Sequence, residues 1–160
     1  MKPCSRQPAK LKTESDRNST FLVIGYGNEL RGDDAVGPII ARKVEALCLP
    51  GVRVITSQQL APELADDIAQ ANRVVFVDAA VDVAEVTFRE VTAGPDTNIV
   101  AHCNSPSVML ALAQAIFGGS PRAWAVTIPV QSLGFTDHVS SSARHAADVA
   151  VEQIRALVDA

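Results

Sequence analysis

Two adjacent carboxylates follow the first apolar segment of the chain. Residues 21–24 (FLVI) form an unbroken apolar run, typical of a buried parallel strand, and a glycine-rich turn then leads to Asp33 and Asp34. In open α/β sheets, ligands bind at the carboxyl ends of the strands, so this turn lies where a site is expected. Because its two acids would repel phosphate, the usual ligand of such turns, the turn favours a cation.

A second acid and a histidine follow later elements. Asp78 ends the apolar run of residues 74–77, and His102 lies just before the Ser-Pro pair at 105–106, which predicts the start of a helix. Since the carboxyl ends of parallel strands share one edge, we expect Asp34, Asp78 and His102 to lie together. Two carboxylates and an imidazole can form a divalent-metal site with open positions, and this donor set suits several first-row metals.

Each of these residues also has a structural interpretation. Asp33 and Asp34 can be a helix cap and a solvated acid, and Asp78 can be an acid whose hydrogen bonds are satisfied within the fold. His102 alone would be an ordinary loop histidine. Cys103 beside it can be a ligand or a nucleophile, but a packed thiol is the simpler interpretation. The joint placement at one edge of the sheet favours the metal site.

The rest of the pattern predicts the sheet that positions these groups. Apolar runs predict five strands, at residues 21–27, 52–56, 74–77, 85–90 and 123–128. Helical spacing of apolar residues predicts four helices, at about residues 36–47, 62–70, 105–117 and 141–158. The strand at 85–90 follows its predecessor after too few residues for a crossover helix, so it should pair antiparallel. We therefore expect an α/β three-layer sandwich: a five-stranded, mostly parallel twisted sheet with one antiparallel edge strand and helices on both faces.

Composition and charge limit the function classes. The 160 residues fit one domain, with residues 21–160 as the folded unit and residues 1–20 as a disordered basic tail. The tail has five basic and two acidic residues, which leaves −7 for the rest of a chain whose net charge is −4. That domain has no basic stripe for nucleic acid and no apolar run long enough for membrane insertion. Three widely spaced cysteines suggest neither a disulfide framework nor a CxxC metal site, so we expect a reduced, cytoplasmic protein. We also expect it to be a monomer.

The motifs of several other sites are absent. A dinucleotide fingerprint would need its third glycine where Leu30 stands, and the sequence has no P-loop, nucleophile elbow or HExxH. A nucleotide-binding flavodoxin-like module is therefore disfavoured, since the first loop is also acidic.

Taken together, these residues resemble the hydrogenase maturation endopeptidases, which remove the C-terminal extension from the large subunit of nickel–iron hydrogenases. The resemblance covers about residues 21–160 and rests on a series of motifs in order: residues 25–28 (GYGN), 32–37 (GDDAVG), 59–64 (QLAPEL), 75–79 (VFVDA), His102, 105–106 (SP) and 117–118 (FG). Residues 131–138 (QSLGFTDH) resemble the family's segment before the last helix only loosely.

The resemblance implies an endopeptidase whose nickel-recognising and catalytic residues are Asp34, Asp78 and His102. It also implies that nickel is carried by the substrate, the large-subunit precursor, and is not permanently bound, so that cleavage waits for nickel insertion. Three ligands without cysteine would leave coordination positions open for ligands of the target. The nucleophile stays open: the metal can polarise the scissile carbonyl or activate a water, with Asp34 or Asp78 as proton acceptor. The alternative from another class is a non-cleaving, metal-sensing chaperone of the immature large subunit.

Overall fold

The computed structural model describes residues 20–95 and 105–160. Its strands and helices alternate along the chain as the sequence predicts. The elements are β1 (Phe21–Tyr26), the short 3₁₀ helix η2 (Gly32–Ala35), α1 (Val36–Ala46), β2 (Val52–Ser57), the 3₁₀ helix η3 (Pro62–Leu64), α2 (Ala65–Ala69), β3 (Arg73–Ala80), β4 (Thr87–Val91), α3 (Pro106–Phe117), β5 (Arg122–Pro129) and α4 (Ser141–Asp159).

The described strands form one five-stranded sheet with the order β2-β1-β3-β5-β4. β1 pairs parallel with both β2 and β3, and β3 pairs parallel with β5. β4 pairs antiparallel with β5 at the edge of the sheet, which confirms the prediction from its short connection. The mixed sheet with one antiparallel edge strand is thus the predicted one, and β1 and β3 lie side by side at its centre.

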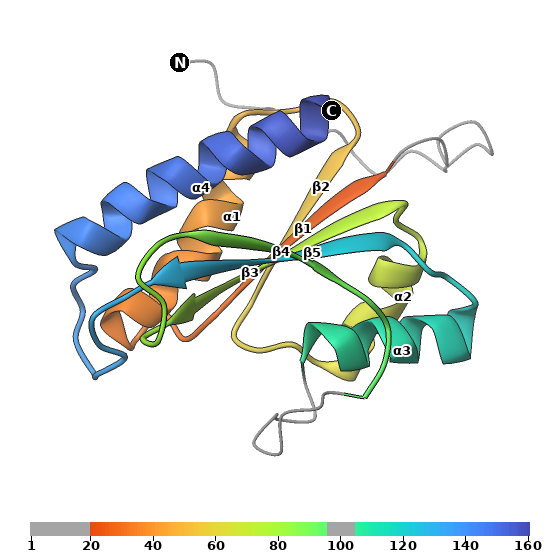
Figure 1. Ribbon diagram of the computed structural model, residues 1–160, viewed down its shortest axis with the longest axis horizontal. Helices are drawn as coiled ribbons and strands as arrows, with labels where there is room; N and C mark the ends of the chain where they lie inside the picture. Colours follow the sequence, from red (N-terminus) through yellow and green to blue (C-terminus); the bar gives the residue numbers. More distant parts are fainter. Residues whose placement is uncertain (1–19, 96–104) are drawn as a thin grey trace.

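Helices cover both faces of the sheet. Figure 1 shows α1 and α4 together on one side and α2 and α3 on the other. The side chains alternate accordingly: Val23 and Val75 pack with the apolar residues of α1 and α4, whereas Ile24 and Phe76 pack with those of α2 and α3. This alternation follows from the two-residue period of a strand, and it fixes the face to which each later strand residue points.

The third strand is longer than its apolar run. The sequence predicts its end at Asp78, but β3 continues to Ala80 because Asp78, Ala79 and Ala80 pair with residues of β5. Asp78 therefore lies inside the strand, two residues before its end. Asp78 is an even number of residues from Val74 and Phe76, so its side chain lies on the same side of the strand, the α2–α3 face of the sheet.

Helix ends follow the predicted capping signals. The Ser105 side chain accepts a hydrogen bond from the Val108 backbone N–H, so Ser105 is the N-cap of α3, and the helix ends at Gly118 in the left-handed conformation. No helix among the described residues is both long and apolar enough to cross a membrane.

Candidate functional site

The glycine-rich loop after β1 positions Asp34. Gly27 has a φ of +148°, and a Cβ added there would lie 1.9 Å from the Asp34 carbonyl oxygen. Only glycine allows η2 to fold back this closely on the end of β1. The Asn28 backbone N–H donates to Asp34 Oδ2 at 2.8 Å, which fixes the carboxylate at the carboxyl edge of the sheet.

The start of α1 packs directly on the ends of the two central strands. A Cβ added at Gly37 would lie 2.3 Å from the Tyr26 carbonyl oxygen and 2.8 Å from that of Val77. The Tyr26 carbonyl is at the end of β1, and the Val77 carbonyl is in β3, directly before Asp78. Gly37 therefore sets the distance between the helix that follows Asp34 and the strand that carries Asp78.

Asp78 is partly buried and is held by two neighbours. Its Oδ1 accepts a hydrogen bond from the Ala79 backbone N–H at 2.8 Å, and the Tyr26 hydroxyl hydrogen-bonds to its carboxylate. The pKa of Asp78 is raised to about 6, chiefly by burial and to a smaller extent by the charge of Asp34, while the hydrogen bonds from Ala79 and Tyr26 act in the opposite direction. Burial and the charge of Asp78 in turn raise the pKa of Tyr26, so its hydroxyl stays protonated and able to donate.

The structure thus brings two of the predicted site residues within electrostatic range of each other. Asp34 comes from the loop after β1 and Asp78 from β3, and the pairing of β1 with β3 makes them neighbours. Two carboxylates in a partly buried position repel each other, and a cation bound between them would relieve that repulsion. Oxygen donors of this kind suit a divalent metal.

His102 lies outside the described residues, as does Cys103. Within the described part of the chain, no group of three histidine, cysteine, aspartate or glutamate residues is arranged to hold a metal, so the three-ligand site stays a prediction. The nearest described residue is Ser105, the N-cap of α3. The helix that begins after Ser105, α3, packs on the same face of the sheet as the Asp78 side chain.

Asp33, next to Asp34 in sequence, has a different role. It is 5% exposed, and its carboxylate accepts hydrogen bonds from the Ser140 backbone N–H at 2.7 Å and from the Ser140 hydroxyl at 2.8 Å. Ser140 is in turn the N-cap of α4 and accepts from the Ala143 N–H. Asp33 therefore joins η2 to the start of the last helix: its role is structural, but it is neither a cap of its own helix nor a solvated acid.

Nothing in the sequence indicates that Tyr26 has a role at the site. It is the last residue of β1, and the register that aligns Gly25 with Val77 places it beside Asp78. Its phase along the strand matches that of Leu22 and Ile24, which point to the α2–α3 face. The alternation of side chains along a strand predicts that Tyr26 and Asp78 lie on the same face of the sheet. Only the register of β1 against β3 shows that they are in contact.

Comparison with known proteins supports the fold assignment. No family model and no curated protein matches the sequence. Among solved structures, the [NiFe] hydrogenase maturation protease HycI from Thermococcus kodakarensis matches with a TM-score of 0.72 and 20% identity, covering 89% of this chain and 94% of its own. The hydrogenase maturating endopeptidase HybD from Escherichia coli matches with a TM-score of 0.67 and 22% identity, covering 88% and 92%. The chain therefore has the fold of the hydrogenase maturation proteases.

Proposed function

We propose that this protein is an endopeptidase that removes the C-terminal extension of a nickel–iron hydrogenase large subunit after nickel insertion. The observation that carries the proposal is the pair formed by Asp34 and Asp78 at the carboxyl edge of the two central strands. The shared fold supports the same reading, since the similar structures include a maturation protease and a maturating endopeptidase. We place the activity in the cytoplasm, in keeping with three cysteines that suggest no disulfide framework.

The donor set fits a metal that arrives with the substrate. Asp34 and Asp78 supply two oxygens, and His102 would supply a nitrogen by the family resemblance. Such a site leaves coordination positions open and holds an ion more weakly than a closed four-ligand site. Nickel already inserted in the precursor would then bind the protease through ligands from both proteins. A precursor without nickel would lack this contact, which links cleavage to completed nickel insertion.

The electrostatics of Asp78 suit both recognition and proton transfer. With a pKa of about 6, the carboxyl is mostly ionised at neutral pH and can ligate a cation, yet it is more basic than an ordinary aspartate. A general base is most effective when its pKa is near the working pH. In our proposal, Asp78 or Asp34 accepts the proton released when water adds to the scissile carbonyl.

The direct test uses mass spectrometry of the large-subunit precursor after incubation with the protein. We expect the nickel-loaded precursor to lose its C-terminal extension, and we expect the nickel-free precursor to remain intact under the same conditions. Equal cleavage of both forms would refute nickel recognition. Stable binding of the loaded precursor without cleavage would instead identify the protein as a metal-sensing chaperone.

Tyr26→Phe should shift the pH dependence of processing. The Tyr26 hydrogen bond lowers the pKa of Asp78, so its loss should raise that pKa above about 6. More of Asp78 is then protonated near neutral pH and unavailable to a cation, so the acid limb of kcat/KM should move to higher pH, by up to about one unit. The measurement is the pH profile of kcat/KM from pH 5 to 8.5. At the alkaline end the two proteins should have similar rates, and an acid limb that stays in place or moves to lower pH would contradict this role.

A further inference from the structure

Residues of the segment before α4 pack against the loop that carries Asp34. The Gly32 backbone N–H donates to the Thr136 carbonyl oxygen at 2.7 Å, and the Asp33 carboxylate binds Ser140. Immediately before these tied residues in the two segments, the Arg31 guanidinium carbon lies 4.8 Å from the centre of the Phe135 ring. The stacked pair therefore directly adjoins the hydrogen bonds between the two loops, and the Arg31 backbone N–H donates to the Asn28 carbonyl oxygen at 3.0 Å, so Arg31 has a defined position three residues before Asp34.

The Arg31 guanidinium lacks the partners that such a group normally has. Its Nε is buried and has no hydrogen-bond partner among residues 20–95 and 105–160, and no carboxylate in these ranges forms an ion pair with the guanidinium. A guanidinium has five N–H donors, and leaving a buried one unsatisfied costs free energy. The stacking on Phe135 keeps the group in place although it gains no acceptor within the described part of the chain.

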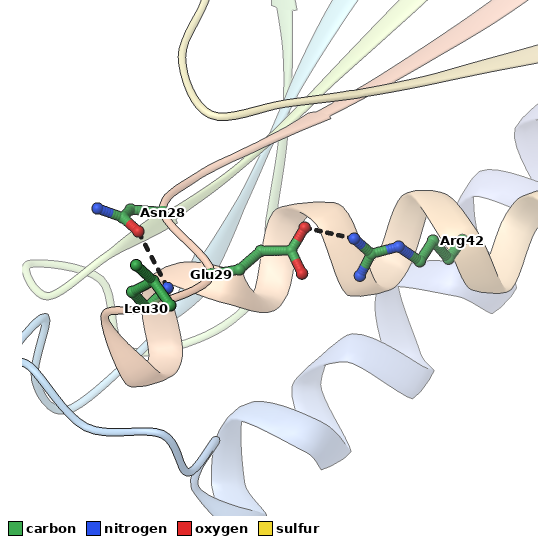
Figure 2. Close-up of polar contacts among 4 residues, drawn as sticks. All are labelled: Asn28, Glu29, Leu30 and Arg42. Carbon is green, nitrogen blue, oxygen red and sulfur yellow. Dashed lines mark hydrogen bonds and ion pairs between the residues drawn. The ribbon is translucent and has the colours of Figure 1, made fainter.

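Nearby acids are committed to other groups. Figure 2 shows the Glu29 side chain extended along α1 toward Arg42, with which it forms an ion pair. Asp33 binds Ser140, Asp34 accepts from the Asn28 N–H, and Asp137 contacts His138 at 3.1 Å, as three separate interactions. The loops around Arg31 thus hold four carboxylates, and none of them neutralises it.

The same edge of the molecule exposes large apolar side chains. Phe135 is 83% exposed, and Leu30 is 76% exposed and lines a cleft of about 240 Å³ between the loop after β1 and the end of β2. The Leu30 backbone N–H is tied to the Asn28 side chain, as Figure 2 also shows, which fixes the loop while the Leu30 side chain stays exposed. Exposed apolar side chains beside a fixed cation that has no ion-pair partner among the described residues are suited to an extended segment that carries an acidic group.

We propose that Arg31, stacked on Phe135, binds a carboxylate of the precursor segment that is cut, and so determines which precursors the protein accepts. This inference rests on the proposed function, whose site begins three residues further along the chain. The domain carries a net charge of about −7, and Asp34 and Asp78 would repel an acidic peptide, so a dedicated cation at the entrance is needed for one to bind. The carboxylate is either an acidic side chain near the cleavage point or the C-terminal carboxylate of the extension.

The test compares Arg31→Gln with wild-type protein on nickel-loaded large-subunit precursor, measuring both processing kinetics and precursor affinity. We expect KM and the dissociation constant to rise about tenfold or more with kcat nearly unchanged, because a charge-assisted contact is lost in binding. Precursors with single acidic side chains neutralised, or with one added C-terminal residue, identify the source of the carboxylate. For the precursor variant that lacks the carboxylate bound by Arg31, wild-type and Arg31→Gln protein should have equal affinity.

Arg122→Gln is the matched control. Arg122 also lies over an aromatic ring, 5.1 Å from the centre of Trp124, but at the start of β5, at the opposite end of the sheet, and it is paired with Glu90. Its replacement should leave KM unchanged. An unaltered affinity for Arg31→Gln, or an equal loss for both variants, would overturn the inference. If wild-type protein binds precursor through Arg31 without cutting it, the inference stands and the peptidase proposal fails; if it neither binds nor cuts, both fail.

Discussion

Replacing Asp78 by asparagine is expected to abolish processing of nickel-loaded precursor while the protein remains folded. The amide is neutral, so it is a poor ligand for a divalent cation and cannot accept the proton released during hydrolysis. Loss of a direct ligand should lower kcat/KM more than about a hundredfold, beyond the effect of removing a residue that only supports one. His102→Ala should have the same effect if His102 has the role that the family resemblance implies. The measurement is the rate of precursor cleavage, followed by mass spectrometry.

The same substitution should stabilise the protein at pH 7. The folded state raises the pKa of Asp78 from 3.8 to about 6, so it favours the protonated form. The contribution of this group to stability is therefore fully present below about pH 4 and is lost as pH rises through about 6. Asparagine stays neutral and its Oδ1 can still accept from the Ala79 N–H. We expect a gain of at most about 3 kcal/mol at pH 7, less because the side chain is partly exposed, and none at pH 4.

Asp82→Asn is the matched control for this pair of expectations. Asp82 is an exposed aspartate four residues further along the chain, in the connection that follows β3. Its replacement should change neither the cleavage rate nor the free energy of unfolding, measured by urea denaturation at both pH values. Wild-type processing by Asp78→Asn would remove this residue from the site. A loss of stability at pH 7 would show that the carboxylate is a structural group whose charge the fold favours.

Most of the fold was accessible from the sequence because its signals are local. Apolar runs identify the strands, and the few residues between β3 and β4 are enough to exclude a crossover helix. The end of β3 was misplaced because its last residues are paired through the backbone with β5, and that pairing leaves no trace in the apolar pattern of residues 74–77. Bounds set by pairing between distant strands depend on register, which a single sequence does not contain.

The site was accessible in outline only. Topology places the residues after β1 and those at the end of β3 at one edge, so Asp34 and Asp78 could be proposed together. The separate role of Asp33 depends on Ser140, which is 107 residues away in the chain. The contact of Tyr26 with Asp78 depends on the register of β1 against β3, and the stacking of Arg31 on Phe135 depends on how a long loop folds back. Each of these contacts arises from tertiary packing and not from local sequence.

Gly37→Ala should lower both the stability and the processing activity of the protein by moving α1 away from the sheet. A Cβ at this position would lie 2.3 Å from the Tyr26 carbonyl oxygen and 2.8 Å from that of Val77. Both contacts are with backbone atoms of the central strands, so no change of side-chain rotamer can relieve them, and α1 must move away from the sheet. We expect unfolding to become easier by about 3 kcal/mol. Processing should fall as well, because Asp34 and Asp78 separate as the helix moves.

Gly94→Ala distinguishes this effect from the general cost of replacing glycine. A Cβ added at Gly94 would have no neighbour within 4 Å among the residues that the structure describes, and the position has no positive φ. Its stability should therefore change by less than about 0.5 kcal/mol, as measured by urea denaturation in parallel with Gly37→Ala. Equal stability of the two variants would show that α1 can shift on the strands at little cost. In that case the distance between Asp34 and Asp78 would be set elsewhere, and the close approach at Gly37 would not be what holds the two carboxylates together.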